Sequence, residues 1–213
     1  PLDYDLATSA LPDQVERVFA GERVVPTGAA HGTVTLVTGA MAIEITTFRI
    51  DGEYLDHRRP EAVRFTRSLR EDLARRDFTV NAMAWSPSKG LIDPMGGRRD
   101  IGARLIRAVG DPCARFSEDA LRILRALRFA SSLNFDVERQ TARALLSMKE
   151  QLAFVARERI GAEVINLATG RGAWRVIGAF KPVLAAAVPA LCEMDEAGWA
   201  RSLGALRRAP PEG

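Results

Sequence analysis

The stretch Leu2-Asp3-Tyr4-Asp5-Leu6, near the start of the chain, decides the fold class. Acidic and apolar residues alternate there with a period of two, which predicts a β-strand. Both carboxylates then project from one face of the strand, while the three apolar side chains face the core. Two acids aimed at one point repel each other unless a cation lies between them, so Asp3 and Asp5 are candidate ligands of Mg²⁺. The alternative is an edge strand with a solvated acidic face.

Glu44 is the candidate third carboxylate. It lies between Ile43 and Ile45 in the β-rich run 42–50, which Thr38-Gly39-Ala40 joins to another β-rich run, 33–38, as in a hairpin. An unpaired acid among apolar neighbours is expensive to bury. If this strand lies beside the first, Glu44 completes the acidic cluster. An acid on an exposed strand face is again the alternative.

The rest of the chain separates into a mixed part and a helical part. Ser9 and Pro12 predict the start of a helix that runs to about residue 19, and residues 67–83 are predicted to be largely helical. Prolines and glycines between Pro87 and Gly97 predict a loop at a domain boundary. Further helices are predicted over residues 117–133, 137–149, 157–169, 174–187 and 196–206.

Composition limits the function classes. The 213 residues are 47% apolar and 27% charged, and no apolar stretch approaches the ~20 residues that span a bilayer. Two histidines exclude a multi-histidine metal site, and two distant cysteines suit a reducing compartment. No cationic, apolar leader opens the chain, so we expect a cytoplasmic protein that does not enter membranes.

Charge is distributed unevenly along the chain. Residues 1–101 carry 13 basic and 15 acidic side chains, whereas residues 102–213 carry 17 basic and 12 acidic ones. Of the 30 basic residues only three are lysines. An acidic N-terminal half followed by an arginine-rich C-terminal half suits metal chemistry in the first half and the binding of a polyanion by the second. A generally arginine-rich surface is the alternative.

Two further clusters combine arginine with acidic or amide side chains. Residues 75–82, Arg-Arg-Asp-Phe-Thr-Val-Asn-Ala, supply phosphate clamps and hydrogen-bonding groups for a sugar, or else a salt-bridged helix face. In residues 117–128 Ser117 is expected to cap a helix whose first turn holds Glu118 and Asp119, both within one turn of Arg122. This second cluster is either an ordinary set of helix salt bridges or a donor and an acceptor that recognise the edge of a base.

Together these segments resemble the family of class II tRNA nucleotidyltransferases and bacterial poly(A) polymerases. Five segments, in the family's order and spacing, are similar to its metal-binding strand, sugar motif, hinge, amino-acid template and neck motif. They are residues 3–8, 75–82, 93–100, 118–125 and 157–163. Residues 28–34 and 44–49 extend the resemblance, which covers about residues 1–170.

The resemblance implies an α+β fold. A polymerase-β-like head with a small mixed sheet is expected over residues 1–101, a helical neck over 102–170 and the start of a helical body over 171–213. The implied activity is template-independent addition of CMP and AMP, from CTP and ATP, to the 3′ end of tRNA.

The resemblance also assigns roles to residues. Asp3 and Asp5, with Glu44, are the implied catalytic and Mg²⁺-binding carboxylates. The implied nucleotide contacts are Arg76, Asp77, Asn81, Asp119, Arg122, Arg125 and Arg128.

One family element is missing from the sequence. The family has a Gly-Gly-x-x-Arg-Asp turn upstream of its metal-binding strand, and no residue precedes Pro1 here. We therefore expect a trimmed or fragmentary form, or a chain with compromised activity. Poly(A) polymerase, CC-only or A-only addition, an inactive RNA-binding fragment and a small-molecule nucleotidyltransferase are the alternatives.

Overall fold

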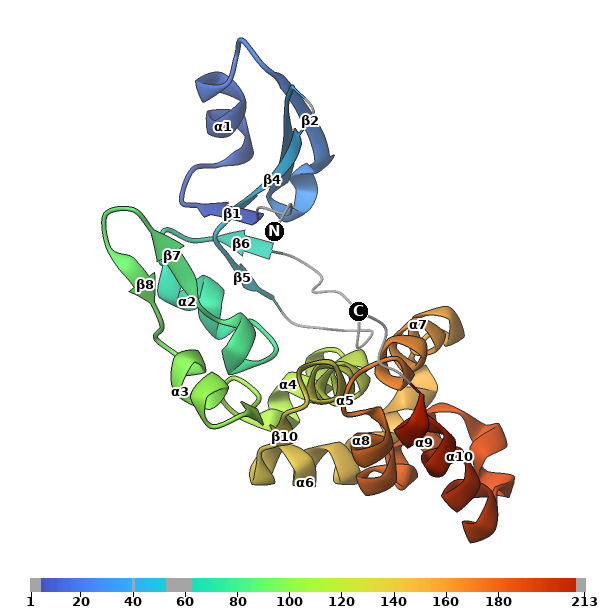
Figure 1. The fold of residues 1–213 in the computed structure, drawn as a ribbon. Coiled ribbons are helices and arrows are strands. Elements are labelled where there is room, and N and C mark those ends of the chain that lie inside the picture. Colours follow the sequence, from blue (N-terminus) through green and yellow to red (C-terminus); the bar gives the residue numbers. More distant parts are fainter. Residues whose placement is uncertain (1–4, 40, 53–62, 210–213) are drawn as a thin grey trace. The chain divides into compact units, whose positions relative to one another are not determined.

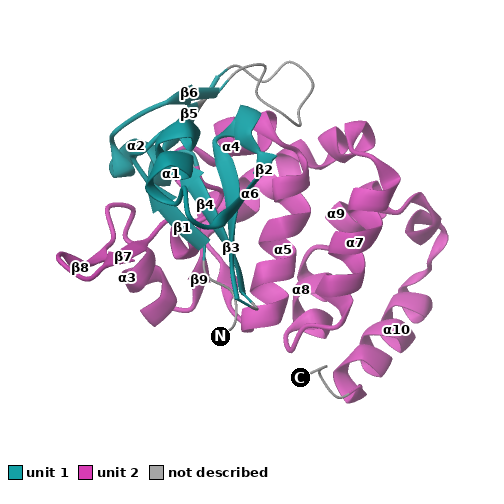
Figure 2. Ribbon diagram, turned by 90° about the horizontal axis from the view of Figure 1, so that it is seen from above, with its two compact units in different colours: residues 1–53, 60–75 teal, residues 54–59, 76–213 magenta. Residues whose placement is uncertain are grey.

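The computed structural model describes residues 5–39, 41–52 and 63–209, which form two compact units (Figures 1 and 2). Among the described residues, the first unit covers 5–39, 41–52 and 63–75, and the second covers 76–209. This division lies earlier in the chain than the predicted head–neck boundary at residue 101, which stays a prediction about functional domains. Asp3 lies outside the described residues.

The first unit is built on a four-stranded mixed sheet with the strand order β1-β4-β3-β2. β1 pairs with β4 in parallel, and the other pairs are antiparallel. The unit comprises β1 (Asp5–Thr8), α1 (Pro12–Val18), β2 (Arg23–Gly28), a 3₁₀ turn (Ala29–His31), β3 (Thr33–Thr38), β4 (Met41–Thr47), β5 (Arg49–Asp51), β6 (Val63–Phe65) and α2 (Leu69–Ala74).

Side-chain alternation along β3 and β4 creates the core of this unit. Val34, Leu36 and Ile45 are buried on one face of the sheet, where they pack against Val15 of α1. The predicted β3–β4 hairpin is confirmed, as is a strand around Asp5. Leu6 shares the core face with Ile45 but is 48% exposed, because β1 is the edge strand.

The second unit is mostly helical. Its elements are a 3₁₀ turn (Thr79–Asn81), β7 (Ala84–Ser86), β8 (Gly90–Ile92), α3 (Gly97–Gly102), β9 (Leu105–Ile106), α4 (Pro112–Glu118), α5 (Leu121–Leu133), β10 (Asp136–Val137), α6 (Arg139–Met148), a 3₁₀ segment (Lys149–Phe154), α7 (Arg157–Ala168), α8 (Ala173–Ala179), α9 (Lys181–Ala187), a 3₁₀ turn (Pro189–Glu193) and α10 (Glu196–Arg208).

Helix α5 lies at the centre of this unit and packs against α7 and α8 (Figure 2). Its apolar stripe, which includes Ile123, Leu124 and Leu127, is buried. Gly97 lets α3 approach the 3₁₀ turn closely, since a Cβ there would lie 2.1 Å from the carbonyl oxygen of Thr79. The predicted α+β class, a mixed sheet followed by a mostly helical part, is confirmed.

Three helix predictions were wrong in detail. The region 67–83 is helical only over α2, because Phe78 is extended (φ −127°, ψ 150°) and Thr79–Asn81 form a 3₁₀ turn. The predicted helix 117–133 is broken, since Asp119 is extended (φ −143°, ψ 105°) between α4 and α5. The predicted helix 174–187 is interrupted at Phe180, where Pro182 occupies the first turn of α9.

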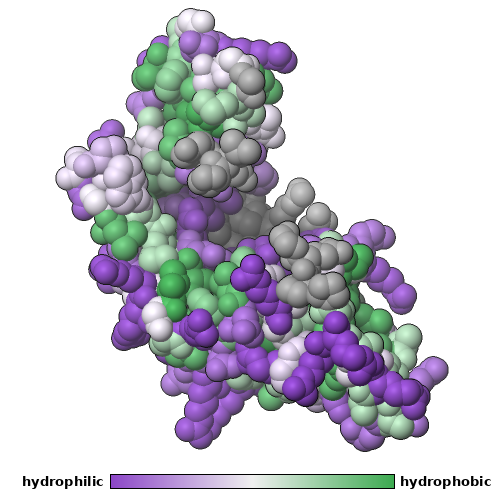
Figure 3. All heavy atoms as spheres, in the orientation of Figure 1, coloured by the Kyte–Doolittle hydropathy of each residue, from purple (hydrophilic) through white to green (hydrophobic). Residues whose placement is uncertain are grey.

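Hydrophilic side chains cover much of the face shown in Figure 3. Among the helices of the described residues, none has the length and apolarity needed to cross a bilayer. Cys113 and Cys192 are both free and exposed.

Candidate active site

The acidic face of the first unit is fixed by strand register. Asp5 of β1 lies directly opposite Glu44 of β4, and opposed residues of paired strands project from the same face. Because Ile45 points into the core, these two carboxylates project from the other side of the sheet, away from α1. The condition on which the role of Glu44 depended, that its strand lies beside the first, is therefore met for Asp5.

Hydroxyl groups share this face with the acids. Thr35 of β3 lies opposite Glu44, and its hydroxyl is 2.8 Å from that of Thr27. Asp5 and Glu44 are exposed, so Glu44 carries no cost of burial, contrary to the sequence argument. Carboxylate oxygens presented side by side to solvent suit a hard divalent cation such as Mg²⁺. Within the described residues, which exclude Asp3, no group of three or more potential ligand side chains is assembled.

In the second unit, residues of the sugar motif form hydrogen bonds with one another around Asp77. One carboxylate oxygen of Asp77 accepts hydrogen bonds from the backbone N of Phe78 at 2.8 Å and from Nδ2 of Asn81 at 3.2 Å. The Arg76 guanidinium donates to the backbone carbonyl of Asn81 at 3.1 Å. The motif is thus a loop held by its own side chains rather than a face of a helix.

The other oxygen of Asp77 binds Arg125 of α5. Nε and Nη2 of Arg125 donate to it at 2.9 and 2.6 Å, across 48 residues of sequence. The Asp77 side chain is 8% exposed and that of Arg125 34%. This ion pair ties the sugar motif to the central helix, and the structure thereby brings together four residues that the sequence had singled out.

The junction between α4 and α5 differs from the sequence prediction. Glu118 ends α4, and Asp119 lies between the helices, so neither residue is in the first turn of α5 and Ser117 does not cap it. Oδ1 of Asp119 accepts from the backbone N of Leu121 at 3.0 Å, and Oδ2 pairs with Arg159 of α7 at 3.0 Å.

Arg122 pairs with Glu118, as the i,i+4 spacing predicted. The same carboxylate also binds Arg115, one turn earlier in α4, and Arg122 donates to the backbone carbonyl of Arg115 at 3.1 Å. Arg115 is a site residue that sequence reasoning missed, although its i,i+3 spacing to Glu118 could have indicated it.

Arg128 completes a row of arginines on α5. Its Nε donates to Glu163 of α7 at 2.6 Å, and its guanidinium lies 4.0 Å from the centroid of the Phe129 ring. Arg122, Arg125 and Arg128, which we call the arginine row, therefore bind three different segments of the second unit: the end of α4, the sugar motif and α7.

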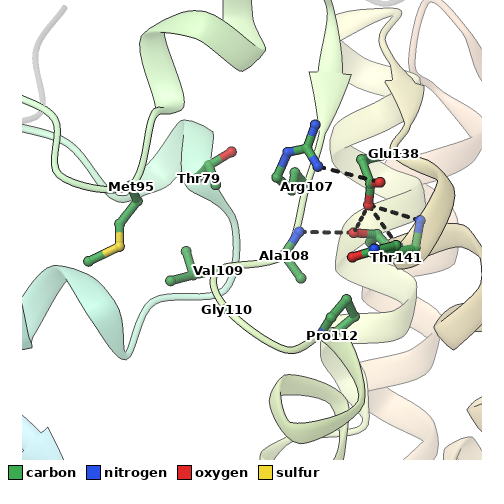
Figure 4. Close-up of a pocket in the computed structure, with 10 residues that line it drawn as sticks. Thr79, Met95, Arg107, Ala108, Val109, Gly110, Pro112, Glu138 and Thr141 are labelled. Carbon is green, nitrogen blue, oxygen red and sulfur yellow. Dashed lines mark hydrogen bonds and ion pairs between the residues drawn. The ribbon is translucent and has the colours of Figure 1, made fainter.

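A cavity of about 190 Å³ is lined by Thr79 of the sugar motif and by Arg107 and Glu138 (Figure 4). Arg107 on its wall donates to the buried Asp100 at 3.0 Å and pairs with Glu138 at 3.4 Å. Burial alone would raise the pKa of Glu138, but hydrogen bonds from Thr141 and Gln140, with the charge of Arg107, lower it overall. Arg107 and Glu138 were also missed, because they lie in segments without a recognisable motif.

Comparison with known proteins identifies the family. Residues 1–107 match the Poly A polymerase head domain. The chain belongs to the family of class II CCA-adding enzymes and bacterial poly(A) polymerases. It is 46% identical to the CCA-adding enzyme of Geobacillus thermodenitrificans over 206 residues, which are 96% of this chain and 50% of that protein. The chain thus spans about half the length of the curated relatives it matches.

Solved structures of this family have the same fold. The crystal structure of the Bacillus stearothermophilus CCA-adding enzyme in complex with CTP superposes with a TM-score of 0.76 at 34% identity, over 95% of this chain and 57% of that one. A tRNA nucleotidyltransferase complexed with a primer tRNA and an incoming ATP analogue gives a TM-score of 0.68 at 30% identity, over 88% and 54%.

Proposed function

We propose that this protein adds CMP and AMP from CTP and ATP to the 3′ end of tRNA without a nucleic-acid template. The observation that supports this best is the Asp77–Arg125 ion pair, which joins the sugar motif to α5, the helix that holds Arg122 and Arg125 of the template element. The family membership and the likeness to structures bound to CTP, an ATP analogue and tRNA support the same substrates.

In the proposed reaction the 3′-hydroxyl oxygen of the RNA attacks the α-phosphorus of the nucleotide. A new P–O bond forms, the bond to the bridging oxygen breaks, pyrophosphate leaves and the hydroxyl proton is released. Asp5 and Glu44, with Asp3, would hold Mg²⁺, which supplies positive charge for the developing negative charge. Asp77 and Asn81 would position the ribose, and Arg76 the triphosphate.

Base selection is assigned to Asp119 and Arg122. Cytosine and adenine both present an amine donor beside a ring-nitrogen acceptor, whereas uracil and guanine present a carbonyl beside an N–H. A carboxylate has about four lone-pair positions, so Asp119 can accept from the amine while it still binds Leu121 and Arg159. The guanidinium of Arg122 would donate to the ring nitrogen. Arg125 supports this pair through Asp77, and Arg128 through Glu163.

Nucleotide selection by the chain tests this function. The protein is titrated with each of the four nucleoside triphosphates and then incubated with tRNA that lacks its 3′ CCA and one labelled nucleotide at a time. We expect CTP and ATP to bind more tightly than UTP and GTP, and only CMP and AMP to be incorporated. Equal affinity for all four nucleotides would contradict the proposal.

A further inference from the structure

The β7–β8 hairpin presents an apolar pair to solvent. Trp85 and Leu91 lie opposite each other on the two strands and are 69% and 49% exposed. Their neighbours on the other face of the hairpin, Ala84 and Ile92, are half-buried. The chain has two other tryptophans: Trp199 is buried, and an arginine lies over the ring of Trp174. Trp85 is therefore the most exposed indole of the chain.

The adjoining segment surrounds this pair with positive charge. Lys89 in the hairpin loop and Arg98, Arg99 and Arg104 in and after α3 are exposed. Figures 1 and 2 both place α3 beside the hairpin. These four cations, with Trp85 and Leu91, form what we call the hairpin–α3 surface.

The two acids of this segment offset only half of that charge, so residues 84–104 keep a net charge of +2. Asp93 uses its two carboxylate oxygens to accept from the backbone N of Gly97 at 2.7 Å and of Arg98 at 2.9 Å. Asp100 is completely buried and binds Thr79 and Arg107. Arg99 approaches Asp100 only to 3.8 Å and keeps a side chain that is 75% exposed. The outward charge of residues 84–104 is therefore positive.

We propose that the hairpin–α3 surface binds the RNA substrate, with an unpaired base stacked on Trp85 and phosphates held by Arg98 and Arg99. The inference rests on the proposed function and adds a binding surface outside the nucleotide site. An exposed indole flanked by arginines combines a stacking platform with an electrostatic clamp for the backbone. The indole stacks on an unpaired or terminal base, because bases within a duplex already stack on each other.

Affinity for fluorescein-labelled tRNA without its 3′ CCA tests this proposal by fluorescence anisotropy at several salt concentrations. Trp85→Ala should weaken binding roughly fivefold or more with little change in the salt dependence. Arg98→Glu with Arg99→Glu should weaken binding and lower the slope of log Kd against log salt concentration by about 1.5. Arg17→Glu is the matched control, because the Arg17 side chain on α1 is 72% exposed. It should leave Kd unchanged, as should Trp85→Phe.

Each other outcome overturns the proposal in a distinguishable way. If the unaltered protein binds tRNA and the hairpin and α3 variants bind equally well, the surface is wrong while the proposed function stands. If the unaltered protein shows no affinity for tRNA, both fail. If Trp85→Ala changes the sedimentation mass but not tRNA affinity, the surface is a protein interface. Urea unfolding of each variant separates lost contacts from lost folding.

Discussion

The two units hold their candidate site residues in contrasting ways. In the first unit Asp5 and Glu44 lie on an exposed sheet face, positioned only by strand register, and neither takes an ion pair within the described residues. In the second unit Asp77 and Asp119 are largely buried and pair with arginines 48 and 40 residues away. Exposed acids cost the fold little, whereas buried charges must be paired. Substitutions should therefore separate activity from stability in the first unit and couple them in the second.

The largest expected effect is on activity in the first unit. Asp5→Ala should reduce nucleotide addition by two or more orders of magnitude, because metal-ion stabilisation of the reacting phosphate contributes several kcal/mol. Stability should not change, since this side chain packs against no part of the core. Addition of labelled CMP to truncated tRNA and thermal unfolding measure the two effects. Asp13→Ala, at another exposed acid of the same unit, is the control. Full activity of Asp5→Ala would remove this residue from the site.

The second effect is on stability in the second unit. Asp77→Ala removes the carboxylate oxygen that accepts from Nε and Nη2 of Arg125 and leaves the backbone N of Phe78 without its acceptor. We expect a loss of about 2–3 kcal/mol in the free energy of unfolding, below the value for a fully buried pair because Arg125 is partly exposed. Urea denaturation measures it. A loss no larger than that of Asp13→Ala would show that the contrast between the units is wrong.

The sequence could predict features that depend on local residues, but it could not predict contacts between distant segments. Period-two alternation and a glycine turn depend on local residues, so the β3–β4 hairpin and the strand around Asp5 were predictable. The pairing that brings Glu44 beside Asp5 is long-range, so the sequence could state it only as a condition. The break at Asp119 was not, because leucines continue at helical spacing across residues 117–133 and only tertiary contacts, such as that with Arg159, reveal the extended residue. The Asp77–Arg125 pair joins distant segments and has no periodicity to reveal it.

The third effect is on nucleotide choice. Asp119→Ala and Arg122→Ala should each reduce incorporation of CMP and AMP and relax the rejection of UTP and GTP about tenfold, since an unpaired buried group costs roughly 1–3 kcal/mol. Single-nucleotide incorporation assays measure this. Arg159→Ala removes the other partner of Asp119 without touching the base, so it should lower stability more than selectivity. If both variants keep the original preference for CTP and ATP, then Asp119 and Arg122 have only a structural role.

The smallest effect is on the pH dependence of stability. Because the pKa of Glu138 is lowered in the folded protein, this group stabilises the fold above its ordinary value of 4.5, and the contribution is lost as pH falls through the lower folded value. Glu138→Gln removes that contribution. The difference in unfolding free energy between the two proteins should therefore shrink as pH falls below about 4.5. Urea titrations at pH 6 and pH 3.5 measure it, and a constant difference would contradict the prediction.

The spacing of the arginine row has a consequence for how the site can vary. Three residues of an α-helix advance about 4.5 Å along the axis and fall roughly 60° short of a full turn. The row therefore winds around α5 as a shallow spiral, and its members face Glu118, Asp77 and Glu163 in turn. Spacing that alternated between three and four would have kept all three on one face of the helix. A substitution of Glu118 or Asp77 therefore changes the connection of one arginine, whereas a substitution of Glu163 changes two, because Glu163 also lies 4.0 Å from Arg125.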